Sequence, residues 1–331
     1  MKSIPSNQYL SKLLWVVGAM ACTILAVTAT LSAQQATATA PAATTPARLP
    51  TSAKPFSTPQ EAADALIDAA AKFDVPALEE IFGPEGDDIV LSGEYPQDMQ
   101  RALDFAAQAR EKKSVSVDPK RASRAILIVG NEDWPFPVPI VKVAGKWYFN
   151  AAAGRQELFD RRVGSNELDA IDICQGYVEA QYEYAFKVRE GYNVTQYAQR
   201  IVSTPDKQDG LAWKNPDGKW EGPIGEKIAR ALEQGYTTGA EPYHGYFFKI
   251  LKGQGPATPL GEMDYVVKGI MIGGFALVAA PAEYGESGVM TFIVSQDGVV
   301  YQKDFGPNTL TEFIKMDRFN PDKSWAPVLE N

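Results

Sequence analysis

The chain has 331 residues, 45% of them hydrophobic, and a formal net charge of -9 at pH 7. This length is sufficient for two globular domains. The negative charge argues against a nucleic acid or an anionic membrane surface as a partner, because both carry charge of the same sign. A protein or a small ligand is the expected partner.

The N-terminal residues 1–33 have the pattern of a secretory signal peptide. Lys2 and Lys12 precede an apolar run, and small residues at its end favour cleavage after Ala33. We therefore expect export to the periplasm or the cell exterior. The alternative is an uncleaved anchor at 13–33, since a membrane-spanning helix needs about 20 apolar residues. Membrane contact is expected only through that leader.

Residues 34–55 are rich in alanine, threonine and proline and nearly uncharged. Such a segment cannot bury a core, so we predict an extended linker. Of the two cysteines, Cys22 lies in the leader and Cys174 in the body of the chain. Cleavage would leave Cys174 alone and would exclude an intramolecular disulfide in the mature chain.

Residues 56–160 are predicted to form a first domain in which helices precede a sheet, the α+β class. Thr58 is a good helix cap, because Pro59 and Glu61 follow it in the first turn. A turn at 144–146 joins the last two expected strands. Helices are expected from residue 59 onward, at 76–82 and at 97–113, and strands at 114–117, 124–129, 140–143 and 147–149.

Two stretches of this domain, PQEAADALIDAAAKFDVPALEEIFG and GKWYFN, resemble the cone-shaped nuclear-transport-factor-2-like and cystatin-like domains. The resemblance implies helices packed on a curled antiparallel sheet. That group includes enzymes and plain binding modules, so it implies no particular activity. Its catalytic members place a histidine–aspartate or similar pair in the cone. The first domain has no histidine, which argues against an acid–base enzyme there.

The segment WPFPVP at 134–139 is the most unusual local feature of this domain. Its three prolines fix an extended backbone and lack N–H donors. One interpretation is a rigid loop in which Trp134 and Phe136 line a pocket or a partner surface. The other is a connector that packs both rings into the core, where most apolar side chains lie.

Residues 161–331 are predicted to form a second α+β domain. A charged helix is expected at 154–162 and a long helix at 166–188, with Cys174 in the apolar stripe of the long helix. No crossover helix fits between the strands, which favours an antiparallel sheet with one face on a helix. Asp297 and Gly298 are predicted to form a tight turn in which both have positive φ. Strands are expected at 246–251, 264–268, 275–280, 289–295 and 299–303, and further helices at 222–234 and 309–316.

Several segments of the second domain resemble the globular part of type IV pilins: AQY at 180–182, GYFF at 245–248, AAP at 279–281 and GVMTF at 288–292. The resemblance implies a long helix packed on an antiparallel sheet. In pilins a polymerising stem and a prepilin peptidase site precede that helix. A folded domain is predicted there in this chain, so a fibre subunit is not expected even if the fold is shared.

Longer segments, from about Pro55 to the C-terminus, resemble an uncharacterised bacterial family of secreted proteins, the domain of unknown function 2950. These segments are DWPFPVPIV, AAAGRQELFDRRVGSNEL, AQRIVSTPDKQDGLAW, PYHGYFFKIL and MIGGFALVAAPAEYGESGVMTFIVSQDGVVYQKD. The resemblance implies export and brings no assigned activity.

His244 is the single histidine of the chain and its one candidate general base. Cys174 is a weaker candidate for a nucleophile that would meet it in space, since a thiol in an apolar stripe is usually inert. A local hydrogen bond at the start of a strand is the alternative role for His244. Neither an EF-hand pattern nor a histidine–glutamate spacing is present, so no metal or cofactor is predicted.

Aromatic side chains are enriched at binding surfaces, and they supply the candidates for contact with a ligand or a partner. These candidates are Trp134, Phe136, Tyr243, His244 and Tyr284. The leading hypothesis is therefore a non-enzymatic, exported envelope protein that binds a protein or a small ligand. The alternatives are a hydrolase-like enzyme that uses His244 with Cys174 or a carboxylate, and an accessory subunit of a pilus-like assembly.

Overall fold

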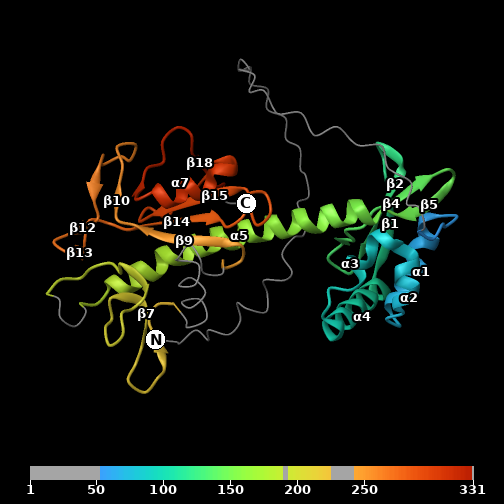
Figure 1. The fold of residues 1–331 in the computed structure, drawn as a ribbon, viewed down its shortest axis with the longest axis horizontal. Coiled ribbons are helices and arrows are strands. Elements are labelled where there is room, and N and C mark those ends of the chain that lie inside the picture. The colour runs from blue at the N-terminus through green and yellow to red at the C-terminus, as the bar shows by residue number, and fades with distance from the viewer. Residues whose placement is uncertain (1–52, 189–192, 225–241, 330–331) are drawn as a thin grey trace, which may run out of the picture. The chain divides into compact units, whose positions relative to one another are not determined.

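The computed structural model describes residues 53–188, 193–224 and 242–329, which form two compact units that divide between Leu158 and Phe159 (Figure 1). The predicted leader, most of the predicted linker and most of the helix predicted at 222–234 lie outside these residues. Within the described ranges, no helix combines the length and the apolar character that a membrane span requires. Each unit has its own hydrophobic core.

In the first unit, helices precede strands. The helices are α1 (Pro59–Ala70), α2 (Val75–Phe82), α3 (Asp87–Val90) and α4 (Tyr95–Glu111), with a 3-10 turn at Pro84–Gly86. The strands are β1 (Lys113–Asp118), β2 (Arg121–Val129), β3 (Trp134–Pro135), β4 (Ile140–Val143) and β5 (Lys146–Phe149). The sheet has the order β1-β2-β4-β5, β3 pairs with β2, and all of these pairings are antiparallel.

The helices of the first unit cover one face of this sheet. Along β2, Ala125, Leu127 and Val129 are buried while the residues between them are half-buried, the alternation expected of a sheet with one covered face. These side chains share a core with residues of α1, α2 and α4. Helix α1 begins at a capping interaction, in which Thr58 Oγ1 accepts the Glu61 N–H at 3.0 Å.

The second unit contains most of helix α5 (Ala151–Ala185), which begins in the first unit, and the short helix α7 (Thr309–Lys315) after a 3-10 turn at Gly306–Asn308. Its central sheet is antiparallel, with the strand order β18-β16-β15-β14-β9. These strands are β9 (Tyr246–Leu251), β14 (Ala276–Pro281), β15 (Met290–Ser295), β16 (Tyr301–Asp304) and β18 (Ala326–Pro327).

Smaller pairings lie outside the central sheet of the second unit: β11-β10-β17, β12-β13 and β6-β7-β8. Strand β10 is parallel to β17 and β6 is parallel to β7. The strands are β6 (Arg200–Val202), β7 (Gly210–Lys214), β8 (Trp220–Glu221), β10 (Gly253–Gln254), β11 (Met263–Asp264), β12 (Val266–Val267), β13 (Ile270–Met271) and β17 (Arg318–Phe319).

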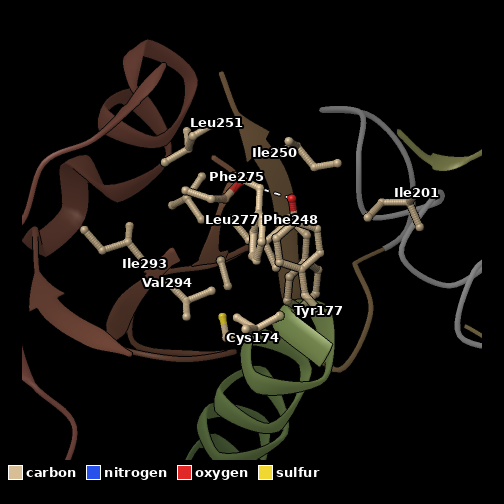
Figure 2. Packing of buried hydrophobic residues seen from close by; sticks show 14 of the residues in the cluster. Cys174, Tyr177, Ile201, Phe248, Ile250, Leu251, Phe275, Leu277, Ile293 and Val294 are labelled. Carbon is tan, nitrogen blue, oxygen red and sulfur yellow. Dashed lines mark hydrogen bonds between the residues drawn. The ribbon is translucent and has the colours of Figure 1, made fainter. Parts of the chain in front are cut away.

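One face of the central sheet packs on helix α5. The strand register places Phe248 beside Ala279 and Ala279 beside Phe292, and these residues share a core with Cys174 and Tyr177 of α5. Figure 2 shows both α5 side chains pointing from the helix into this layer. The Tyr177 hydroxyl donates to the Ala276 carbonyl at 3.4 Å, so a polar contact accompanies the apolar packing.

The opposite face of the central sheet packs on helix α7. Lys249 lies on this face, and its ammonium group donates to the carbonyls of Phe313 and Ile314, the latter at 3.1 Å. The same ammonium lies 4.9 Å from the centre of the Phe313 ring. Burial lowers the pKa of Lys249, and the charge of Asp317 opposes this shift. This lysine therefore joins β9 to the C-terminal end of α7.

The predicted α+β class is confirmed. The prediction of a central strand at 264–268 is wrong, because Tyr265 divides this segment between β11 and β12. Lys268 and Gly269 have φ values of 53° and 83°, and this tight turn folds β12 back on β13 instead of extending it along the sheet. The helices predicted at 154–162 and 166–188 are parts of the one helix α5.

The turn predicted at Asp297 and Gly298 also differs in detail. Gly298 has a φ of 77°, whereas the φ of Asp297 is not positive. The Asp297 carboxylate accepts the Val299 N–H at 3.2 Å and the Ser295 hydroxyl at 2.9 Å, a local arrangement that the aspartate side chain favours. Two successive residues with positive φ occur instead at His244 and Gly245.

Phe248→Ala is expected to destabilise the second unit by about 3–5 kcal/mol, because truncating a buried phenylalanine loses transfer free energy and leaves a cavity. Phe248 is fully buried. The measurement is urea unfolding, with Phe186→Ala as the matched control. Phe186 is 88% exposed, and its loss is expected to change the free energy of unfolding by no more than about 0.5 kcal/mol. Equal effects of the two substitutions would contradict the packing described above.

Candidate functional site

His244 occupies a tight turn at the start of strand β9. It has a φ of 47° and Gly245 has a φ of 74°, and the Tyr243 and Tyr246 backbones exchange two hydrogen bonds of 3.0 Å across them. Both features are those of a type I′ turn. His244 tolerates this left-handed conformation better than a β-branched residue would. The turn therefore holds the histidine at a fixed backbone position.

The His244 imidazole is paired with a carboxylate of helix α5. Its Nδ1 atom forms a hydrogen bond with Asp169 Oδ2. The Asp169 side chain is 14% exposed and the His244 side chain 40% exposed. A carboxylate on Nδ1 favours the tautomer that donates from Nδ1, which leaves Nε2 as the acceptor nitrogen. In this tautomer, Nε2 can accept a hydrogen bond.

The turn is supported from behind by close packing of Gly245. A Cβ atom at this position would lie 2.8 Å from both Asn166 Nδ2 and Ser287 Cβ. Asn166 itself donates to the Ser287 carbonyl at 2.8 Å, and the Ala282 N–H donates to the Gly245 carbonyl at 2.9 Å. Helix α5 and the segment before β15 thus hold the turn from two sides.

One carboxylate and one aromatic ring contact the imidazole. The Tyr243 ring lies 4.3 Å from the His244 ring, centre to centre. Burial raises the pKa of Tyr243, and the charge of Asp169 adds to this shift. Burial likewise raises the pKa of Asp172, one helical turn below, with a further contribution from Asp169. We call Asp169, Asp172, Tyr243 and His244 the turn surface.

Cys174 lies elsewhere. Its side chain is fully buried in the layer between α5 and the central sheet, as Figure 2 shows. Burial raises the pKa of the Cys174 thiol far above its ordinary value. No hydrogen bond joins Cys174 to His244 among the described residues, so the structure brings His244 together with Asp169 and Tyr243 and leaves Cys174 in the core.

The other candidate contact residues lie outside the turn surface. Trp134 and Phe136 are half-buried in the first unit, and the Phe136 ring packs between Phe82, Phe105 and Phe149. Tyr284 is half-buried in the second unit, and its hydroxyl donates to Asp304 at 3.2 Å. Pro135 is the exposed part of the proline segment.

Sequence reasoning missed Asp169, which is 75 residues from His244 along the chain. A usable signal was present: Asp169 directly precedes the buried Ala170 on α5, so it had to lie at the margin of the packed face. As for metals, the described residues contain no group of three or more histidine, cysteine, aspartate or glutamate side chains placed to hold an ion.

A family model matches most of the chain. The family model described as protein of unknown function (DUF2950) matches residues 53–328. Neither a curated protein nor a solved structure matches the chain. The resemblances to cone-shaped domains and to pilins therefore stay predictions.

We expect the Cys174 thiol to be inert in the folded protein, because it is buried and its pKa is raised. In a full-length Cys22→Ser variant, Ellman's reagent should detect almost no thiol under native conditions and one thiol per chain in concentrated urea. Rapid stoichiometric labelling of the native protein would show that Cys174 is accessible, and it would restore a nucleophilic role for this residue.

Proposed function

Because the chain belongs to the family of proteins of unknown function DUF2950, we propose its function from the turn surface: it is an exported, non-enzymatic module that binds a cationic segment of a partner protein. The observation that carries this proposal is the pairing of His244 with Asp169, which fixes an aromatic turn against helix α5. Export rests on the leader pattern in residues 1–33.

The turn surface is organised before a partner arrives. Reciprocal backbone hydrogen bonds close the turn, and Asn166 and Ser287 support Gly245. A surface that is already ordered loses less conformational entropy on binding. Rigid aromatic side chains such as Tyr243 provide contact area with few rotatable bonds, which is why they serve as anchors in binding sites.

The chemistry of the turn surface favours cationic donors. His244 Nε2 and the carboxylates of Asp169 and Asp172 all accept hydrogen bonds. The Tyr243 ring adds a face on which an ammonium or guanidinium group can rest. A lysine or arginine of the partner would therefore find a carboxylate and an aromatic ring within one small area. The net charge of -9 strengthens the attraction at long range.

Two observations favour binding over the hydrolase-like alternative. Cys174 is buried, and the Ser287 hydroxyl is engaged with the backbone of Glu283, from which it accepts at 3.0 Å and to which it donates at 3.2 Å. Neither is a free nucleophile for His244.

The test uses fluorescently labelled oligo-arginine and oligo-glutamate peptides with protein isolated from the cell envelope, where the proposal requires an N-terminus at Gln34. We expect saturable binding of the oligo-arginine peptide alone, weakened by salt. Tyr243→Ala should lower its affinity at least tenfold, a loss typical of an aromatic anchor. Tyr95→Ala is the matched control, since Tyr95 is 58% exposed and lies in the first unit.

Equal affinity of the Tyr243→Ala and Tyr95→Ala proteins would mean that the peptide binds through net charge alone, and the turn surface would lose its role. Recovery of the protein solely from the cytoplasm would remove the export part of the proposal. The two results are independent, because the peptide assay does not depend on where the protein was found.

One specific observation supports the hydrolase-like alternative. The Asp169 carboxylate orients the His244 imidazole, as a carboxylate does for many histidine general bases. Its test is turnover of p-nitrophenyl acetate by the wild type and by His244→Asn, which keeps an N–H donor and removes Nε2. We expect equal, non-saturable rates. A loss of about a hundredfold or more in the variant, the range of general-base catalysis, would make the enzyme the better assignment.

A further inference from the structure

A second site of the second unit has no connection to the turn surface. A cavity of about 210 Å³ lies beside the C-terminal end of helix α5, strand β6 and the turn between β12 and β13. Its lining is polar and comes from segments distant in sequence, among them Tyr184, Gln196, Arg200 and Gly269. The volume is below the 300 Å³ or so at which pockets for drug-sized ligands begin, which indicates a small molecule.

The walls of this cavity are fixed by hydrogen bonds. The Tyr184 hydroxyl donates to the Gln208 carbonyl at 2.6 Å, and Gln199 Nε2 donates to the Gly269 carbonyl at 2.8 Å. The Asp209 carboxylate accepts the N–H and the hydroxyl of Thr204, each at 2.8 Å. These donors and acceptors are already paired within the protein. The groups therefore fix the shape of the cavity more than they offer hydrogen bonds to a ligand.

Gln196 is different. Its side chain lines the cavity, and only 5% of the surface of the residue is exposed. The amide presents two donors and an acceptor, so this residue is suited to a ligand that both donates and accepts.

Arg200 supplies the charge of the cavity. Its Nε lies 3.6 Å from Asp209 Oδ2, and its Nη atoms form no hydrogen bond with the residues that the structure describes. Since the Asp209 oxygens already accept from Thr204, the guanidinium fork remains available to an anion. A carboxylate matches this fork in a bidentate manner. Gln199 and Tyr197 line the same cavity, and amide and phenol side chains can form hydrogen bonds with hydroxyl groups.

We propose that this cavity binds a small hydroxylated carboxylate, whose carboxylate pairs with the Arg200 guanidinium and whose hydroxyl groups bond the Gln196 amide. Neutral polyols fit the amides but offer no anion to the Nη atoms of the guanidinium. Simple cations are disfavoured because the Asp209 carboxylate is occupied. The site is separate from the turn surface and does not depend on the function proposed there.

The test is isothermal titration of the full chain with D-glucuronate and D-glucose, which share a hydroxylated ring and differ in the carboxylate. We expect saturable binding of D-glucuronate and at least tenfold weaker binding of D-glucose. Arg200→Gln should remove this preference, so that both sugars bind with similar weak affinity. Arg121→Gln is the matched control, because Arg121 is exposed on β2 of the first unit, and it should leave the preference unchanged.

Gln196→Leu separates a ligand contact from a structural role. Leucine has a similar size and no polar atoms, so the folding temperature of the variant without sugar should stay close to that of the wild type. Its affinity for D-glucuronate should fall at least tenfold. Tyr243→Ala should bind D-glucuronate as the wild type does. The proposal fails if D-glucuronate gives no saturable binding, if D-glucose binds equally well, or if Gln196→Leu or Arg200→Gln retains full affinity.

Discussion

Strand β14 is buried along its whole length, and this constraint shapes the second unit. A strand buried on both sides needs a layer above and a layer below it. Helix α5 provides one layer and α7 with β17 the other. The small side chains of Ala276, Ala279 and Ala280 let neighbouring elements approach closely, while the larger rings on β9 and β15 fill the remaining space. Without either layer, one face of β14 would be exposed to water.

The turn surface follows from the same packing. Strand β9 must begin at Tyr246, because the Tyr246 ring packs with Phe292 in the buried layer. The turn before it then lies at the edge of that layer. On α5, the buried Ala170 and Cys174 face the sheet, and Asp169 emerges beside them at the margin. Burial of the core therefore places the Asp169 carboxylate beside the His244 imidazole, although the two residues are distant in sequence.

Local patterns in the sequence predicted the elements that local chemistry decides. The run of aromatic and β-branched residues from Tyr246 to Leu251 coincides with β9, and the Thr58 cap opens α1 as expected. The failures have tertiary causes. Separate helices were expected at 154–162 and 166–188, yet the single helix α5 continues through Gly164, since a single glycine costs only about 1 kcal/mol in a helix.

Candidate sites were harder to predict than elements, for a physical reason. The Asp169–His244 pair and the polar cavity each bring together residues that are far apart in the sequence. The periodicity of apolar residues predicts helices and strands, but it does not predict which distant residues meet in space. The turn chemistry was also ambiguous. Asp297-Gly298 has the sequence of a type I′ turn, but the aspartate side chain stabilises another conformation. His244-Gly245 adopts the type I′ φ values without the usual sequence signal.

The contact between Lys249 and helix α7 has a consequence for the C-terminal part of the chain. Helix α7 has seven residues, fewer than the 12–15 or so that an isolated helix needs in water. Its helical conformation therefore depends on contacts with the sheet, which the Lys249 ammonium and the Phe313 side chain provide. A chain shortened before Thr309, by proteolysis for example, would present Val278 and Ile293 to solvent. Residues 309–329 thus cover an apolar face of the sheet, and large exposed apolar patches favour aggregation.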